Sequence, residues 1–508
     1  MCQVDEEYHD QLERTDVPSA SQKCVKCKEV SAAVVIRAGD AYCRGCFKEY
    51  FIHKFRAMLG KNRIIFPGEK VLLAVSGGPS SCSMLSQVQE GLSQKAHKKL
   101  RFFPGIVYID EGGAVGQPTE ERQRTVSELE MVFKATGFPF HIVPLEQVLD
   151  LPGSVVVTAL PPSQQPPSAY KAAVDRFNQI CGSDCLAPPE QQQKKSPPDV
   201  HESHTQLLQQ LIGSAKTLTA REDLLNTLRQ HLLVHTARTE GYSKLMLGDS
   251  CTRLAIKLLT SISLGRGAQL AQDTGFSDSR YGDIISVRPM RDYSAKEIAH
   301  YNRMFNVPSV VIPSLETKTS EKASIQRLTE SFVTKLQTDF PSTVSTIYRT
   351  SEKLQTACRS SSTDDHSDRC LLCLCVLDTA VEKASAFQAT LISEQLSQTL
   401  SLGSGSPRQN SGPVKPTSAA SAVQCCSLSG GEDCGRATSG GSCCSSAKET
   451  IDLKSLLCYS CQLTIRDMSS VDHLPQYIMS EAKRRQRRSQ MRDEISEFLL
   501  NDGDEGND

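Results

Sequence analysis

Four cysteines near the start of the chain have the spacing of a metal site. Cys24 and Cys27 form one C-x2-C pair, and Cys43 and Cys46 form a second pair after fifteen intervening residues. Two such pairs on tight turns can close a tetrahedron of thiolates around Zn²⁺, with S–Zn distances of ~2.3 Å. Because four protein ligands leave no open coordination position, we expect a structural zinc. The spacing predicts an N-terminal zinc ribbon over residues 21–55.

A second set of cysteines is divided between two distant parts of the chain. Cys370 and Cys373 form one C-x2-C pair, and Cys458 and Cys461 form the other. The Ser/Gly-rich stretch between them predicts a disordered insertion over 378–448. Such a loop is compatible with one shared site, since the cost of loop closure grows only with the logarithm of loop length. We predict a C-terminal zinc ribbon over 366–468, with Cys375 as an alternative ligand to Cys373.

A glycine-rich loop could bind an anion. Ser76-Gly77-Gly78-Pro79-Ser80-Ser81 follows an apolar run and precedes an expected helix. Glycine lets the backbone approach a ligand closely, and a helix N-terminus offers unpaired N–H groups. No GK[ST] follows, so this is not a P-loop of the Walker A type. The predicted nucleotide-binding residues are Ser76, Gly77, Gly78, Ser80, Ser81 and, in a later Gly-Asp-Ser turn, Asp249.

Basic residues are concentrated just after the first cysteine set. Between Tyr42 and Arg101 there are eleven Lys or Arg residues and three Glu. In 51–70 they alternate with phenylalanines, a pattern that could neutralise phosphates and stack on bases. An amphipathic connector whose phenylalanines dock on a sheet fits the pattern equally well, and both interpretations stay open. The candidate nucleic-acid contacts are Lys54, Arg56, Lys61, Arg63 and Arg266.

The elements that must position these residues follow an α/β pattern. Strands are predicted at 70–75, 105–110, 140–145, 244–247 and 283–287, with helices at 81–92, 120–136, 294–305 and 319–338. Short apolar runs that alternate with helical segments indicate βαβ units and a parallel sheet. We expect this domain to span 62–345. A Pro/Gln-rich stretch predicts a disordered insertion over 157–205.

Composition indicates an intracellular protein without a membrane segment. The 508 residues include 20 Cys, and the net charge is −1. The acidic start, 1–20, is expected to be disordered. It also lacks the apolar core of a signal peptide, so we expect an intracellular protein whose thiols stay reduced. No run of 18 apolar residues occurs. The end of the chain, 480–508, is basic and then acidic. His231 and His235, one helical turn apart, lack a third ligand and are not expected to bind metal.

At this point the chain resembles a known family. The loop SGGPSS resembles the PP-loop ATPases, whose usual signature is SGGxDS and which adenylate a substrate oxygen while releasing pyrophosphate. C-x2-C pairs on both sides of such a core resemble, more narrowly, the two-subunit enzymes that 2-thiolate the wobble uridine of tRNA. The segments GDSCTRLA (248–255), SLGRGA (263–268) and RPMRDYSAKE (288–297) are similar to the second subunit of that group. The resemblance covers about 24–350 and the terminal cysteine pair, and implies an adenine nucleotide alpha hydrolase-like sheet.

Departures from the family signature affect the expected chemistry. Ser80 stands where catalytic members have the Asp of SGGxDS, and Asp249 is the single acid where they have a GHNxDD-like motif that would help to hold Mg²⁺. Thiolating members also carry a C-x2-C before the fourth strand and a later cysteine. The matching stretches here, 228–238 and 313–328, contain no cysteine. We therefore expect no iron–sulfur cluster and no catalytic residue, and treat ATP as a candidate ligand only.

The resemblance implies a partner subunit of a cytoplasmic tRNA thiolase. It would act with a catalytic PP-loop paralogue on tRNAs for Lys, Glu and Gln, with sulfur delivered as a thiocarboxylate on a ubiquitin-like carrier protein. An autonomous ATP-dependent PP-loop sulfurtransferase is one alternative. A zinc-ribbon scaffold with a vestigial nucleotide fold is the other.

Overall fold

The structure is a computed structural model. It describes residues 22–36, 40–94, 96, 99–157, 169–180, 201–315, 317, 319–351, 353, 369–377 and 453–495. All of these belong to one compact unit. The strands are β1 (Val34–Val35), β2 (Ala41–Tyr42), β3 (Lys70–Ala74), β4 (Phe103–Asp110), β5 (Phe140–Pro144), β6 (Lys244–Leu247), β7 (Ser277–Asp278) and β8 (Ile285–Val287).

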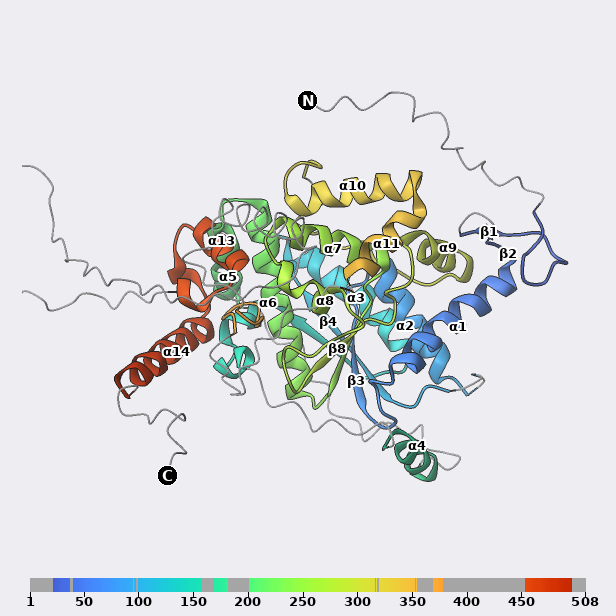
Figure 1. Cartoon of the computed structure of the whole chain (residues 1–508), viewed down its shortest axis with the longest axis horizontal. Helices are drawn as coiled ribbons and strands as arrows, with labels where there is room; N and C mark the ends of the chain where they lie inside the picture. Colours follow the sequence, from blue (N-terminus) through green and yellow to red (C-terminus); the bar gives the residue numbers. More distant parts are fainter. Residues whose placement is uncertain are drawn as a thin grey trace, which may run out of the picture. The chain divides into compact units, whose positions relative to one another are not determined.

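Helices connect the strands, and further helices come after the last strand in the chain (Figure 1). In the first half of the chain they are α1 (Arg44–Asn62), α2 (Pro79–Leu92), α3 (Thr119–Lys134), α4 (Ala169–Ile180), α5 (Glu202–Ser214) and α6 (Leu218–Thr239). In the second half they are α7 (Cys251–Ser263), α8 (Leu270–Thr274), α9 (Ala295–Phe305), α10 (Ile325–Asp339), α11 (Pro341–Ser351), α13 (Tyr459–Asp467) and α14 (Gln476–Ile495). Among the described residues, no helix is long and apolar enough to span a lipid bilayer.

A six-stranded sheet forms the core, with strand order β5-β4-β3-β6-β8-β7. Neighbouring strands are parallel except at the edge, where β7 pairs antiparallel with β8. Consecutive residues of β3, Val71 to Leu73, are all fully buried. A strand buried on both faces reads as a continuous apolar run, which is why its sequence shows no alternation. The predicted α/β class is confirmed.

The strand order places a topological switch point at the centre of the sheet. From β3 the chain proceeds outward through β4 to β5, and then returns to the other side of β3 with β6. Ligands of open α/β sheets bind outside the carboxyl ends of strands at such a point. The loops that leave β3 and β6 are the glycine-rich loop and the Gly-Asp-Ser turn, so these two segments meet where the topology favours a ligand.

The first cysteine unit shares the core of the sheet domain. The predicted boundary at residue 55 falls inside α1, whose residues Phe47, Phe51 and Phe55 are buried in the same apolar cluster as alternate β3 residues. Because α1 packs its aromatic face against the sheet, this helix is part of the sheet domain, and no domain boundary lies at residue 55. The connector interpretation therefore fits Phe55, which is buried in this cluster, and Phe51, whose ring lies against those of Tyr293 and Tyr301.

Some predicted boundaries need correction. The predicted insertion 157–205 contains α4 and the first turn of α5, because Tyr170 and Phe177 of α4 pack against Phe66 and Phe103. The helix predicted at 319–338 begins at Ile325, since the Ser324 side chain caps it by accepting from the Arg327 N–H. The basic stretch 483–488 lies on α14. Residues 1–20, 378–448 and 496–508 lie outside the described residues.

Candidate functional site

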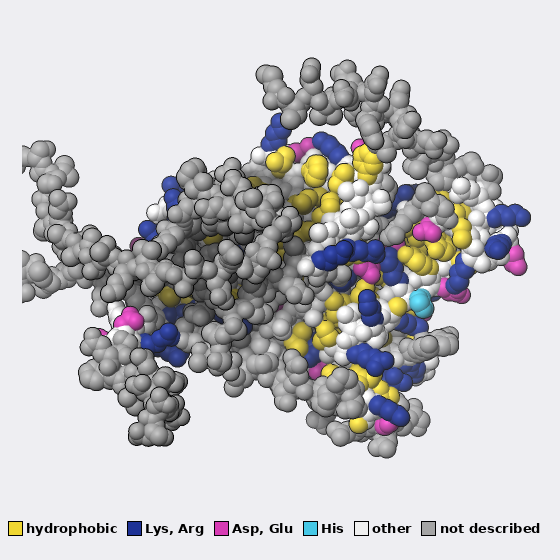
Figure 2. Space-filling view, viewed as in Figure 1, with side chains coloured by type: hydrophobic (Ala, Val, Ile, Leu, Met, Phe, Trp, Pro, Cys, Tyr) yellow, Lys and Arg dark blue, Asp and Glu magenta, His cyan; other side chains and the backbone are white. Residues whose placement is uncertain are grey.

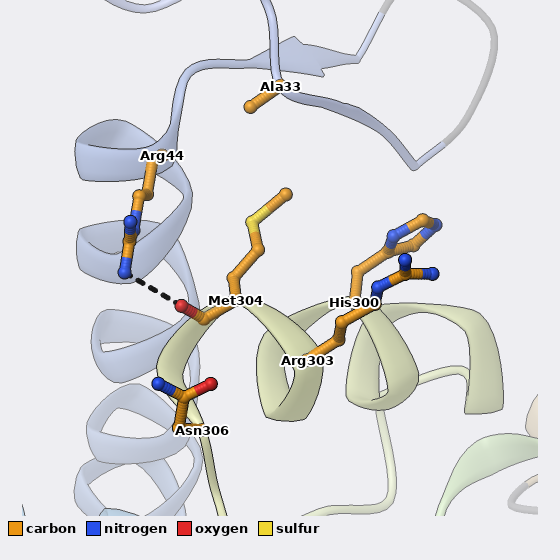
Figure 3. A pocket seen from close by; sticks show the side chains of 6 residues that line it. All are labelled: Ala33, Arg44, His300, Arg303, Met304 and Asn306. Carbon is orange, nitrogen blue, oxygen red and sulfur yellow. Dashed lines mark hydrogen bonds between the residues drawn. The ribbon is translucent and has the colours of Figure 1, made fainter.

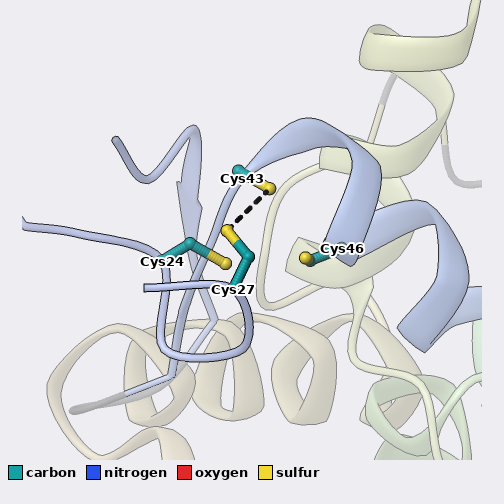
Figure 4. Close-up of side chains that lie close together, drawn as sticks. All are labelled: Cys24, Cys27, Cys43 and Cys46. Atoms are coloured by element: carbon teal, nitrogen blue, oxygen red, sulfur yellow. Dashed lines mark hydrogen bonds between the residues drawn. The ribbon is translucent and has the colours of Figure 1, made fainter. Parts of the chain in front are cut away.

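The four amino-terminal cysteines converge on one point. The sulfurs of Cys24, Cys27, Cys43 and Cys46 all lie within 4.8 Å of one another, and Figure 4 shows them facing a common centre. Cys27 Sγ and Cys43 Sγ are 3.9 Å apart. Tetrahedral coordination with ~2.3 Å bonds requires S···S separations of about 3.8 Å. Burial raises the pKa of Cys24, but backbone N–H donors of Cys27 and Cys43 outweigh it and lower this pKa to about 6. The geometry and a stabilised thiolate both fit a zinc-type ion.

The second set also closes, across the long sequence gap. The sulfurs of Cys370, Cys373, Cys458 and Cys461 lie within 4.8 Å of one another, and Cys373 Sγ is 3.6 Å from Cys458 Sγ. Cys375 is not in the group. Its sulfur instead accepts a hydrogen bond from Arg280 Nη1 at 3.2 Å. The geometry therefore favours Cys373 over Cys375 as the ligand.

Both clusters are built in the same way, and not from two turns as the sequence pattern suggested. The first pair of each lies on a tight turn, and the next residue, Lys28 or Leu374, has a positive φ. Each turn is closed by a backbone bond back to the first cysteine, Lys28 N to Cys24 O and Leu374 N to Cys370 O. The second pair of each lies at a helix N-terminus, where Cys43 and Cys458 are the N-caps of α1 and α13. The positive end of a helix dipole favours thiolate ligands.

The second cluster is fastened to the sheet domain by buried polar contacts. His231 of α6 contacts the Leu372 carbonyl through Nε2 at 2.8 Å and the Tyr477 hydroxyl through Nδ1 at 2.7 Å. Because a carbonyl can only accept, Nε2 carries the proton and Nδ1 accepts from Tyr477. Burial lowers the pKa of His231 to about 4, so the ring is neutral. The histidine is a packing and hydrogen-bonding residue, and it holds the turn between Cys370 and Cys373.

The glycine-rich loop has the expected place between β3 and α2. Gly77 has φ +77°, and a Cβ there would lie 2.9 Å from Ile312 Cδ1. Gly78 is the N-cap of α2, and Ser81 Oγ donates to its carbonyl at 3.0 Å. The Gly-Asp-Ser turn comes so close that a Cβ on Gly248 would meet the Ser81 backbone at 2.8 Å. The structure thus brings the loop residues and Asp249 to the same end of the sheet.

The acid of this site is already engaged by a cation. Asp249 Oδ2 lies 3.3 Å from Arg288 Nε, and the Arg288 side chain is almost fully buried. Lys257 also lies close enough to Asp249 and Arg288 to interact electrostatically, and burial lowers its pKa. A carboxylate already paired with a buried cation is less available to Mg²⁺, because the metal would compete with that ion pair. Sequence reasoning missed Arg288, although it lies in the motif that carried the resemblance.

Cys82 and Cys251, the cysteines near the glycine-rich loop, have unreactive thiols. Cys82 and Cys251 are buried, and burial raises the pKa of each to about 11. The thiolate is the reactive form of cysteine, so these thiols are unreactive near neutral pH. Neither belongs to a group of potential metal ligands among the described residues.

The predicted tRNA-contacting residues have divergent surroundings. Lys54 is mostly buried in an ion pair with Glu297 at 2.7 Å, and Arg266 is paired with Asp223 at 2.6 Å. Lys61 and Arg63 are exposed at the end of α1, and Arg56 lines a cavity of about 700 Å³. Figure 2 shows Lys and Arg side chains spread over the part of this face that carries α1. The five residues do not form one cluster, so their role in tRNA binding stays a prediction.

Comparison with known proteins identifies relatives along the full chain. The chain is 57% identical to the cytoplasmic tRNA 2-thiolation protein 2 of Danio rerio, over 98% of this chain and 99% of the relative. It is 50% identical to the protein of that name from Homo sapiens, over 99% of each. The family model described as cytoplasmic tRNA 2-thiolation protein 2 matches residues 324–463. A solved U34-tRNA thiolase from Methanococcus maripaludis with its [4Fe-4S] cluster is 15% identical, with a TM-score of 0.44, over 67% of this chain and 90% of that chain. The chain belongs to the cytoplasmic tRNA 2-thiolation protein 2 family.

Proposed function

We propose that this protein serves 2-thiolation of the wobble uridine of cytoplasmic tRNA as a partner subunit with little catalysis of its own. The modified nucleoside would be 5-methoxycarbonylmethyl-2-thiouridine, in tRNAs for Lys, Glu and Gln. Membership of the thiolation protein 2 family supports the process, and the names of its relatives support the cytoplasmic setting.

One observation carries the non-catalytic part of the proposal: the loop at the switch point lacks groups that could drive adenylation or sulfur transfer. Ser80 occupies the usual Asp position, and Asp249 is held by Arg288. The buried thiols of Cys82 and Cys251 are protonated at neutral pH. Retained backbone geometry without these groups is compatible with ATP binding, but the described residues around the loop offer no cluster of metal ligands and no ionised thiol.

The missing chemistry would come from partners. A catalytic PP-loop paralogue would adenylate the uridine, and a thiocarboxylated ubiquitin-like carrier would supply sulfur. The two cysteine clusters would each hold a structural Zn²⁺ that keeps the turn and helix of the unit together. In this arrangement the protein contributes surface and stability to a heterodimer.

Loss of the protein in cells, followed by mass spectrometry of tRNA wobble nucleosides, tests the process. We expect 2-thiouridine to disappear and to return when the wild-type chain is expressed again. Unchanged 2-thiouridine would contradict the proposed process. A second measurement, ATP–pyrophosphate exchange by the purified chain alone, tests the non-catalytic part. Robust exchange or tRNA thiolation without a partner would contradict a partner role.

A further inference from the structure

A basic groove lies between the first cysteine unit and α9. It is a cavity of about 610 Å³ lined by Ala33, Arg44, His300, Arg303, Met304 and Asn306. Figure 3 shows Arg44 on α1 facing α9, with His300 and Arg303 side by side on α9. The lining contains two arginines and a histidine but no Asp or Glu. The larger cavity beside Arg56, in contrast, is lined by Glu49 and Glu90 as well as cations.

The cations around this groove are not neutralised. Lys48 of α1 and Lys296 and Arg303 of α9 have no hydrogen-bond or acidic partner among the residues that the structure describes. Lys48 Nζ lies 5.8 Å from the centre of the Phe305 ring, and Arg44 Cζ lies 5.4 Å from it. The whole chain has 57 basic and 58 acidic residues, so a group of cations without acidic partners is a local excess of positive charge. Such an excess attracts a polyanion. Lys296 and Arg303 also disfavour a further positive charge here, since after burial they contribute to the lowered pKa of His300.

The rigid parts of the groove fix its position relative to the glycine-rich loop. Arg44 Nη2 donates to the Met304 carbonyl at 2.8 Å, which joins α1 to the end of α9. Next to Arg303, Asn302 Nδ2 donates to the Pro79 carbonyl at 2.9 Å, at the start of α2. Beyond α9, Val310 N donates to the Gly77 carbonyl at 2.9 Å. Helix α9 therefore presents cations on one side and contacts the segment from the glycine-rich loop to α2 on the other.

We propose that this groove, which is lined by Arg44, His300 and Arg303 and has Lys48 and Lys296 near it, binds the phosphate backbone of tRNA. The inference rests on the proposed function and deepens it, because it names a surface that was not among the sequence-based candidates. Arginine and lysine contacts to phosphate position an RNA without reading its bases. RNA held here would lie beside the loop at the carboxyl ends of β3 and β6. The affinity should therefore depend on salt and be similar for tRNAs of different sequence.

The test is binding of tRNA by the full chain carrying Lys48→Ala and Arg303→Ala, measured between about 0.05 and 0.3 M salt, because the dependence of affinity on salt reports the number of phosphate contacts. Each lost phosphate contact removes about 0.7 to 0.9 from the salt slope, so at about 0.1 M salt the double variant should bind about 25- to 60-fold more weakly. Neither side chain has a polar partner to lose among the residues with a described structure, so we expect the fold to be unaffected. Unchanged metal content and an unchanged unfolding midpoint would verify this.

A matched variant removes the same charge elsewhere. Lys322→Ala with Lys335→Ala deletes two exposed lysines at and before α10, where Lys335 has only an exposed partner, Glu321. This control should retain wild-type affinity and slope. Equal affinity of the groove variant and the control, or no tRNA binding by the wild-type chain, would overturn the inference.

Expression of the groove variant in cells that lack the wild-type protein separates this inference from the proposed function. If the wild-type chain restores 2-thiouridine and the variant does not, with weakened tRNA binding, both ideas are supported. If the variant binds tRNA normally but fails to restore 2-thiouridine, the groove serves an acidic protein partner, and the RNA assignment is wrong while the proposed function stands. If the wild-type chain also fails, the proposed function is wrong.

Discussion

Replacing His231 with Phe should destabilise the protein and loosen its second cysteine cluster. The buried ring joins the Leu372 carbonyl, between the ligands Cys370 and Cys373, to the hydroxyl of Tyr477 on α14. Phenylalanine has a similar shape but can make neither bond. A buried polar group left without a partner costs about 1–3 kcal/mol, so the two groups together should cost about 2–6 kcal/mol. That is a large share of the roughly 5–15 kcal/mol that stabilises a typical protein.

Two measurements check this expectation. Urea denaturation should show a lower free energy of unfolding, and transfer of metal to a chelator should be faster from the second cluster than in the wild-type chain. His235→Phe is the matched control, since His235 lies one turn away on the same helix, is half-buried, and makes no side-chain hydrogen bond among the described residues. It should have little effect on either quantity.

Tyr477→Phe makes the reasoning stricter. That change leaves His231 Nδ1 without its donor, so it should destabilise by about 1–3 kcal/mol alone. In the double variant both partners of that bond are gone, and the combined cost should be smaller than the sum of the single costs. Purely additive effects, or a His231→Phe variant as stable as His235→Phe, would refute the role assigned to the histidine.

Three further predictions follow from the same geometry. Cys373→Ser should lower the bound metal by about one ion per chain, whereas Cys375→Ser should not, as metal analysis of the purified variants would show; equal losses would contradict the ligand assignment. Because burial raises the pKa of Cys82 and Cys251 to about 11, their thiols stay protonated at pH 8, and mass spectrometry after brief iodoacetamide treatment should find both unmodified in the folded protein but modified in urea. Lys54→Ala removes the cation paired with the buried Glu297, which keeps its hydrogen bonds from Tyr50 and Ser294, and should destabilise by about 1–3 kcal/mol, measured by thermal unfolding, whereas Lys61→Ala on the exposed end of the same helix should not.

The sheet was predictable because its strands carry their signal locally. The apolar runs that became β3 and β6 are buried on both faces, so each reads as a strand without knowledge of its neighbours. The edge strand β7, with two residues, is too short to give such a signal. Helix α4 was hidden by the Pro/Gln-rich composition around it, and its position depends on Tyr170 and Phe177 packing against distant aromatic residues.

The cysteine clusters could be predicted from ligand type and spacing, but their construction could not. Nothing in C-x2-C distinguishes a turn from a helix N-terminus; the spacing of Phe47, Phe51 and Phe55 could have indicated α1 immediately after Cys43. Charge partners were the least predictable part. Lys54 and Glu297 are 243 positions apart, and Asp249 meets Arg288 only because β6 and β8 are neighbours. Basic residues in one stretch of sequence therefore gave a poor guide to which cations remain available to a ligand.

Because the second cluster is built from two distant parts of the chain, it can form only late in protein synthesis. Cys373 leaves the ribosome 85 residues before its partner Cys458. At about 5–20 residues per second, that interval lasts roughly 4 to 17 s. During this interval α13 and Tyr477 have not yet been synthesised, so they cannot pack against α6. The thiols of Cys370 and Cys373 have no second pair of ligands with which to bind a metal. A nascent chain that stalls in this window has an incomplete metal site and an α6 surface that still lacks its contact with α13, features that a chaperone or protease can recognise.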